Sequence, residues 1–276
     1  MVFDREKLKE LANETIEISK LGEYKVGNKV VKFDTENDTI LFKKEDMQKV
    51  IDTVNERYPF GTTNFEVIDE GTVDAVFKLS KGYEDKMDLG VLNFASAYHP
   101  GGGFVNGAIA QEECIAQCSD LYIKQITGEG LEYYDINKND CSSYYSDTMF
   151  MSNVVFFKDA NFNKVENPVM CRVLTVPAVN MNKVVGSLSE AKVVMKNRMR
   201  NILYLFAYFG CRDIVLGAFG CGVFGNNPVD VSNAWYDLLI EEDMKKYFKN
   251  IRFSILDRKG RDNNFGTFYN KFKNLL

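Results

Sequence analysis

The sequence predicts an α/β protein with a mostly parallel sheet covered by helices. Three observations lead to this prediction. From residue 64 onward, strand-like apolar segments alternate with amphipathic helical segments. The segment DLGVLNFAS (88–96) is almost continuously apolar, which is typical of a strand buried on both faces. Glycine-rich loops follow two of the predicted strands, at the place where α/β sheets bind their ligands.

The composition indicates a folded protein. The 276 residues are 45% hydrophobic and 26% charged, and they include 21 Phe and 14 Tyr, which excludes a disordered chain. The net charge is −5 and no basic stripe is present, so we expect no duplex nucleic acid as a partner. The N-terminal MVFDREKLKE lacks the apolar region of a signal peptide, and no apolar run approaches the roughly 20 residues that span a bilayer. We therefore expect a soluble, cytoplasmic protein with no membrane partner.

Residues 1–40 are predicted to be mostly helical. Apolar residues recur among charged ones from Leu8 to Ile18, and Gly22 provides a stop. A second short helix is expected over residues 46–56.

The alternation that follows comprises ten elements. The predicted strands are 64–68, 88–96, 147–159, 171–179, 212–219 and 250–257, and the predicted helices are 72–81, 111–126, 189–210 and 228–240. The helix over 189–210 has one apolar side and ends at Gly210. The helix over 228–240 starts with Asn227 as its cap and Pro228 in its first turn.

Cysteine and histidine usage restricts the chemistry. The chain has six cysteines without a C-x-x-C pair, so we expect reduced thiols and no structural zinc: Cys114, Cys118, Cys141, Cys171, Cys211 and Cys221. His99 is the only histidine. Catalysis must then depend mainly on carboxylates, unless His99 itself carries it. We expect neither a metal nor a cofactor.

Two glycine-rich loops lie in equivalent places. HPGGGFVNGAIAQEE (99–113) follows the strand 88–96, and GAFGCGVFGNNP (217–228) follows the strand 212–219. Each leads from a strand into a helix, so its backbone N–H groups and the helix dipole can bind an anion. The two loops together could hold a diphosphate without Lys or Arg.

The second loop also matches a dinucleotide motif. GCGVFG (220–225) fits G-x-G-x-x-G between a strand and a helix. The next strand ends at Asp257, far beyond the roughly 20-residue spacing of a ribose-binding acid. The motif also lies near the C-terminus, and no G-x-x-x-x-G-K-[ST] is present. These departures disfavour a dehydrogenase and exclude a P-loop.

Each feature has a purely structural alternative. Three glycines can form a turn, Glu112 and Glu113 can complement the dipole of the helix they begin, and His99 fits a turn residue. The combination favours a site, because GGG, a further glycine and QEE all fall within residues 99–113 and a second strand-to-helix glycine loop is present.

The stretches NFASAYHPGGGFVNGAIAQEE (93–113) and GAFGCGVFGNNP (217–228) resemble, in that order, two signature loops of bacterial-type poly(ADP-ribose) glycohydrolases. The segments ETIEI, GEYKV and VLTVPAVN are similar to the same family, and the resemblance covers most of residues 1 to 270. It implies a macrodomain-like fold, a three-layer α/β/α sandwich with a mixed sheet. It also implies an N-terminal helical extension (1–60) packed on a macrodomain-like catalytic core (61–276), in one structural unit.

The resemblance implies cleavage of the ribose–ribose O-glycosidic bond of poly(ADP-ribose), with ADP-ribose as the product. By motif position, Glu113 matches the catalytic acid/base and Glu112 matches the glutamate that positions the substrate ribose. The residues assigned to substrate binding are Asn93, Gly101, Gly102 and Gly103 at the distal ribose, Gln111 of the QEE motif, and Gly220, Cys221, Gly222, Val223 and Phe224 of the diphosphate loop.

The residues themselves suggest how two adjacent carboxylates divide the work. Acetal cleavage needs a proton on the leaving oxygen and stabilisation of an oxocarbenium-like centre. Consecutive helical residues point about 100° apart, so Glu112 and Glu113 do not face one bond equally. We expect Glu113 to protonate the leaving ribose oxygen and then activate water, while Glu112 anchors ribose hydroxyls.

Two other functions stay open at this point. One is hydrolysis of another ADP-ribose linkage, on mono-modified protein or nucleobase, and the other is ADP-ribose binding without catalysis. In each case the partner is poly(ADP-ribose) or an ADP-ribosylated macromolecule. Adenine recognition is also open, with Asp69 and Glu70, at the end of the strand 64–68, as candidates.

Overall fold

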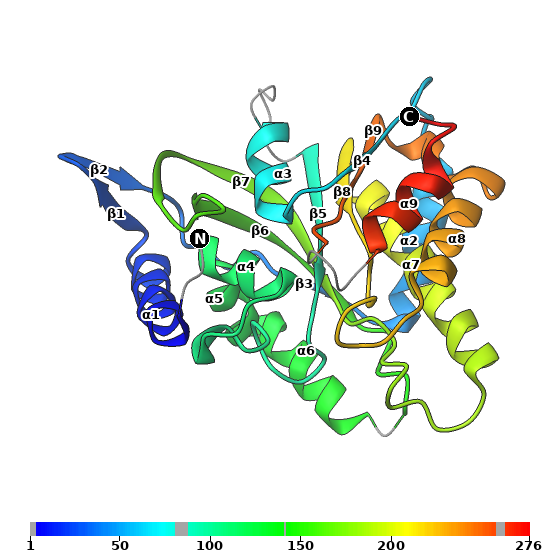
Figure 1. Ribbon diagram of the computed structural model, residues 1–276, viewed down its shortest axis with the longest axis horizontal. Helices are drawn as coiled ribbons and strands as arrows, with labels where there is room; N and C mark the ends of the chain where they lie inside the picture. Colours follow the sequence, from blue (N-terminus) through cyan, green and yellow to red (C-terminus); the bar gives the residue numbers. More distant parts are fainter. Residues whose placement is uncertain (1–3, 81–87, 141, 258–262) are drawn as a thin grey trace.

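A seven-stranded sheet lies at the centre of the computed structural model, which describes residues 4–80, 88–140, 142–257 and 263–276 (Figure 1). The strand order is β3-β6-β7-β5-β8-β9-β4. The strands are β3 (Ile40–Phe42), β4 (Asn64–Ile68), β5 (Leu89–Phe94), β6 (Met149–Lys158), β7 (Lys164–Val176), β8 (Asp213–Leu216) and β9 (Asn250–Ser254). Neighbours from β7 to β4 pair in parallel, whereas β6 is antiparallel to β3 and β7. The prediction of a mixed, mostly parallel sheet is confirmed.

Helices cover both faces of this sheet and complete a three-layer α/β/α arrangement (Figure 1). One layer holds α1 (Arg5–Leu21), α3 (Thr72–Leu79), α4 (Gln111–Cys118), α5 (Leu121–Ile126) and α6 (Gly128–Asn139); the other holds α2 (Met47–Asn55), α7 (Leu188–Tyr208), α8 (Pro228–Tyr236) and α9 (Asn264–Phe272). In β5, Val91 packs with Val73 and Ile115 of the first layer, and the next residue, Leu92, packs with α7 in the second. Both faces of β5 are therefore buried, which agrees with its almost continuously apolar sequence, interrupted only by Asn93.

The N-terminal segment is only partly helical, so the prediction for residues 1–40 was wrong beyond α1. Helix α1 ends at Gly22, as predicted, with the glycine in the left-handed conformation. The chain then forms a hairpin of β1 (Glu23–Val26) and β2 (Lys29–Lys32). Tyr24 and Val31 of the hairpin are buried against Phe157 of β6. This packing against a distant strand favours the hairpin over a continued helix.

Strand β3 extends the central sheet. Its residues Ile40 to Phe42 pair with β6 at the sheet edge. Helix α2 lies where it was predicted, and its buried residues join the same core cluster as α7. The first 60 residues thus supply a strand and a helix to the central layers, and the boundary between 1–60 and 61–276 stays a prediction.

Residues 111–126 form two helices, α4 and α5, instead of the single predicted helix. The break falls at Ser119 and Asp120. Ser119 makes a β-bridge with Phe156, and the Asp120 carboxylate accepts a 2.8 Å hydrogen bond from the Val155 N–H. Both partners belong to β6, so the break depends on a tertiary contact that local apolar spacing does not contain.

Strand β4 has the predicted bounds, and the remaining predicted elements are present with shifted ends. Asn227 caps α8 by accepting a 2.8 Å hydrogen bond from the backbone, as predicted. Strand β7 begins at Lys164, earlier than predicted, and forms a long antiparallel hairpin with β6. Helices α6 and α9 were not predicted. Lys81, at the end of the predicted helix 72–81, and Cys141 lie outside the described residues.

The arrangement of the strands brings the two glycine-rich loops together. Strands β5 and β8 are direct parallel neighbours, so their C-terminal ends meet at the same edge of the sheet. The loops after them are neighbours in space, although helices α5, α6 and α7 and strands β6 and β7 lie between them in sequence. None of the described helices is long and apolar enough to cross a membrane.

Candidate active site

A cavity of about 540 Å³ opens between the two glycine-rich loops, at the C-terminal ends of β5 and β8. The predicted site residues that line it are Gly102, Gly103, Gln111, Glu112, Glu113, Gly220, Gly222, Val223 and Phe224. This is the edge at which ligands bind in parallel α/β sheets. The two motifs therefore contribute to one site.

Glu113 lies in the first turn of α4 and faces the first glycine loop. The Gly103 N–H donates a 2.8 Å hydrogen bond to Glu113 Oε1. Gly102 has a φ of +59°, and a Cβ added to it would collide with the same oxygen and lie 3.2 Å from Glu112 Oε2. Both carboxyl groups thus converge on Gly102, where only glycine fits both the backbone and the space.

Glu112 is almost fully buried, with 4% of its surface exposed. Its Oε2 accepts a 2.8 Å hydrogen bond from the Ser96 N–H. Its Oε1 accepts hydrogen bonds from Gln125 Nε2 at 2.8 Å and from Asn93 Nδ2 at 3.3 Å. The two adjacent glutamates therefore have separate partners, as their helical positions predict.

Burial raises the pKa of Glu112 to about 8. Loss of hydration is the main cause, and the neighbouring Glu113 charge acts in the same direction. The hydrogen bonds from Ser96, Gln125 and Asn93 lower the pKa but do not outweigh the burial. Near neutral pH, Glu112 therefore carries a proton and can both donate and accept a hydrogen bond.

This pKa makes the stability of the protein pH-dependent. Between pH 4.5 and about 8, native Glu112 keeps a proton that the unfolded chain releases. Stability therefore falls as pH rises through this window. The side chain of Glu112→Gln cannot ionise. From pH 5 to pH 8, the decrease in its urea-unfolding free energy should therefore be smaller than that of the wild-type protein by at least about 1 kcal/mol. The exposed Glu166→Gln is the control, and parallel pH dependence in wild type and Glu112→Gln would contradict the assignment.

Hydrogen bonds of the Gln111 side chain link α4 to the end of β5. Its Oε1 accepts a 2.9 Å hydrogen bond from the Phe94 N–H, and its Nε2 donates to the Leu92 carbonyl at 2.7 Å and to Thr72 Oγ1 at 3.2 Å. These bonds join β5, α3 and α4. Gln111 thus sets the position of the helix turn that carries both glutamates.

The second glycine loop is closed by Asn226, which is 4% exposed. Asn226 Nδ2 donates to the carbonyl of Val179 at 2.8 Å and to that of Gly220 at 3.2 Å. The Phe224 carbonyl accepts a 2.8 Å hydrogen bond from the Met181 N–H. The loop is therefore fixed to the segment that follows β7.

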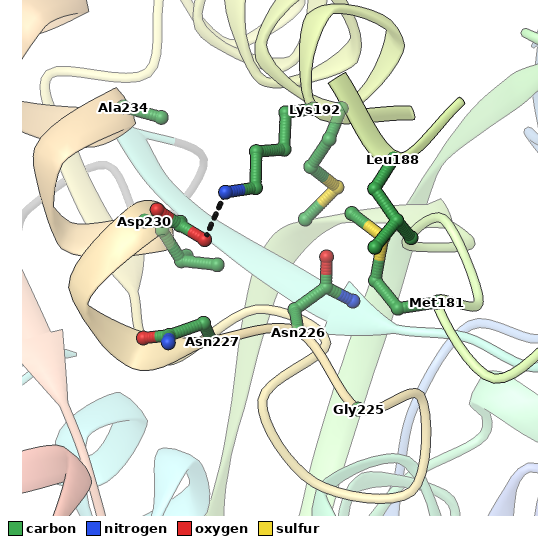
Figure 2. Close-up of a pocket in the computed structure, with 10 residues that line it drawn as sticks. Met181, Leu188, Lys192, Gly225, Asn226, Asn227, Asp230 and Ala234 are labelled. Atoms are coloured by element: carbon green, nitrogen blue, oxygen red, sulfur yellow. Dashed lines mark ion pairs between the residues drawn. The ribbon is translucent and has the colours of Figure 1, made fainter. Parts of the chain in front are cut away.

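Figure 2 shows a second cavity, of about 240 Å³, beside the end of this loop and between α7 and α8. Leu188 and Ala234 line it, and Lys192 forms a 2.8 Å ion pair with Asp230 there. Its walls come from the two helices and the loop end, and neither glutamate of the QEE motif lies in it. The larger cavity, at the strand ends, is therefore the candidate active site.

Three predicted residues do not line the larger cavity. Asn93 is buried and contacts Glu112, so it can act through that side chain. A Cβ added to Gly101 would lie 3.0 Å from the Tyr122 ring, so this residue of the loop faces Tyr122. Cys221 packs against the core, where burial raises the pKa of its thiol to about 12.

Glu70, one of the two candidates for adenine recognition, forms ion pairs within the protein. It is 5% exposed and contacts Lys78 at 2.5 Å and Arg252 at 3.3 Å. It is not among the residues that line the cavity. These contacts indicate a structural role at the end of β4.

Several site residues were missed from the sequence. Those that also line the cavity are Phe94, Ala95, Ser96, Asn106, Ala110, Ala178 and Ala218. His99, for which the sequence left a turn or a catalytic role open, lines the cavity as well. Gln125, fully buried in α5, reaches Glu112 only because the break after α4 reorients the chain. For Ser96, the relevant group is a backbone N–H, which no sequence motif reveals.

A family model and several solved structures are similar to the chain. A family model described as the catalytic domain of microbial-type PARG, poly(ADP-ribose) glycohydrolase, matches residues 12–159. The crystal structure of poly(ADP-ribose) glycohydrolase from Thermomonospora curvata is similar, with a TM-score of 0.91 and 30% identity over 97% of this chain and 100% of that one. The same enzyme bound to the inhibitor ADP-HPD has a TM-score of 0.87, at 30% identity and the same coverage.

The poly(ADP-ribose) glycohydrolase from Deinococcus radiodurans in complex with ADP-ribose is also similar. Its TM-score is 0.80, with 32% identity over 87% of this chain and 96% of that one. No curated protein sequence matches the chain.

Proposed function

Because the chain belongs to the microbial-type poly(ADP-ribose) glycohydrolase family, glycosidases that hydrolyse poly(ADP-ribose), we propose that Glu113 is its general acid and base and that Glu112 anchors the substrate ribose. The observation that carries this proposal is the convergence of both carboxyl groups on Gly102, each with different hydrogen-bond partners. One carboxyl is accessible in the cavity, and the other is buried and neutral near pH 7.

The reaction then proceeds with one carboxyl group acting twice. Glu113 gives its proton to the leaving ribose oxygen as the C–O bond breaks, and the bonding electrons stay on that oxygen. The remaining ribose C1 becomes oxocarbenium-like. The Glu113 carboxylate next takes a proton from water, whose oxygen forms the new bond to C1. One water is consumed, and Glu113 returns to its acid form.

The remaining groups of the cavity hold the substrate. A neutral Glu112 offers a donor and an acceptor, which suits a pair of neighbouring ribose hydroxyls. The glycine loop from Gly220 to Phe224 offers backbone N–H groups to the diphosphate, with the Phe224 ring at the ribose. The substrate is poly(ADP-ribose), and ADP-ribose is the product. A cytoplasmic enzyme without duplex nucleic acid or membrane partners fits this function.

Product analysis tests the proposal. Purified protein is incubated with poly(ADP-ribose) and, separately, with mono-ADP-ribosylated protein, and the products are separated by chromatography. We expect ADP-ribose from the polymer and little release from the mono-modified protein. Release from the mono-modified protein alone would assign the site to another ADP-ribose linkage, and binding without release from either would indicate a non-catalytic module.

A further inference from the structure

Tyr145 has an unusual backbone conformation. Its φ is +63°, in the left-handed region, although the residue is a bulky aromatic with 6% of its surface exposed. Side chains other than Gly, Asn and Asp rarely adopt this conformation, because the Cβ crowds the backbone. Such strain persists only where surrounding contacts enforce it, and it concentrates at functional sites.

Arg198 of α7 enforces the conformation. Its side chain is fully buried, and Nη2 donates to the carbonyls of Tyr144 at 3.0 Å, Tyr145 at 3.2 Å and Ser146 at 3.3 Å. The same nitrogen contacts the Asp147 carboxylate at 2.9 Å. One guanidinium thus organises the whole turn, and its charge is balanced within that turn.

The ring of Tyr145 lies between the two substrate loops. It meets Tyr98, which precedes the first glycine loop, edge-on with centroids 5.3 Å apart. It meets Phe224 of the second loop with centroids 6.1 Å apart. Its hydroxyl accepts a 3.3 Å hydrogen bond from Asn180, in the segment that fastens the second loop. Three segments far apart in sequence meet on this one side chain.

We propose that Tyr145 is a positioning residue that holds Phe224 and Tyr98 together, so that Phe224 is ordered against the substrate ribose before the substrate binds. This inference rests on the proposed role of Phe224 at the ribose. Phe224 lines the cavity and is only partly buried, so without Tyr145 its ring would gain rotamer freedom. The entropy lost when the Phe224 ring becomes ordered would then weaken binding of the ground state and of the transition state equally. The loss is therefore expected in KM and not in kcat.

The chain offers a matched control. Phe162 is also a buried aromatic in the left-handed region, with a φ of +65° and 8% exposure. It lies in the turn between β6 and β7. Because β7 runs parallel to β5, this turn is at the opposite edge of the sheet from the active site. Tyr145→Gly and Phe162→Gly each relieve the same backbone strain and remove one aromatic ring.

With poly(ADP-ribose) as substrate, Tyr145→Gly should raise KM about three- to tenfold and leave kcat within about twofold. Phe162→Gly should change neither. Tyr145→Phe, which keeps the ring, should restore the wild-type KM. If Tyr145→Gly does not fold, Tyr145→Asn and Phe162→Asn replace the pair, since Asn tolerates this backbone.

Equal KM values for the Tyr145→Gly and Phe162→Gly proteins, or a loss in kcat at unchanged KM, would overturn the proposal. Calorimetric titration with ADP-ribose tests the role of Tyr145 independently of the proposed function, because it measures binding without turnover. If the wild-type protein does not cleave the polymer, the proposed function fails. Weaker ADP-ribose binding by Tyr145→Gly than by Phe162→Gly still supports the role of Tyr145, and equal binding overturns it.

Discussion

Glu113→Gln should lower kcat for poly(ADP-ribose) hydrolysis by about 10²–10⁴-fold and leave ADP-ribose binding close to that of the wild-type protein. The amide cannot give or take the catalytic proton. Its oxygen can still accept the hydrogen bond from the Gly103 N–H, so the glycine loop keeps its shape. Turnover is measured by chromatography of released ADP-ribose, and binding is measured by calorimetry with ADP-ribose.

Glu129→Gln is the control for this substitution. Glu129 also lies in the first turn of a helix and accepts a hydrogen bond from a backbone N–H, that of Leu41, but it does not line the cavity. Both variants replace a carboxyl group near a helix N-terminus by an amide of the same size. Full activity of Glu113→Gln, or an equal loss in Glu129→Gln, would remove Glu113 from the chemistry.

Gly102→Ala should lower activity by about 100-fold or more. The added Cβ would collide with Glu113 Oε1 and crowd Glu112 Oε2, so we expect it to displace the Glu113 carboxyl group. A displacement of about 1 Å in an active site costs on the order of 10²-fold. The left-handed backbone adds a stability cost of roughly 1–2 kcal/mol. Activity and urea unfolding are measured on the same preparation.

Gly27→Ala separates these two effects. Gly27, in the turn between β1 and β2, has nearly the same φ, +58°, and no atom lies within 4 Å of an added Cβ. It should lose similar stability and keep full activity. If Gly102→Ala were as active as Gly27→Ala, the close approach of Gly102 to the two carboxyl groups would have no catalytic meaning.

Local sequence patterns predicted correctly those helices and strands whose conformation does not depend on contacts with distant parts of the chain. The almost continuously apolar strand β5 is buried on both faces, and the cap at Asn227 begins α8. The same patterns failed at β1, β2 and β3, and at the break after α4. In each case a contact with β6 decides the conformation. For the hairpin and β3, this strand is more than a hundred residues away in the sequence.

The place of the candidate site in the fold and its two carboxyl groups could be predicted from the sequence. Two glycine loops follow parallel strands, and one of them ends in Glu112 and Glu113, so strand topology alone brings both motifs to one edge. The difference between the two glutamates depends on the tertiary structure. The burial and hydrogen bonds that raise the pKa of Glu112 come from β5, the loop after it and Gln125 of α5. The desolvation of a group depends on all the atoms packed around it in the folded protein, so it cannot be inferred from the neighbouring residues in the sequence.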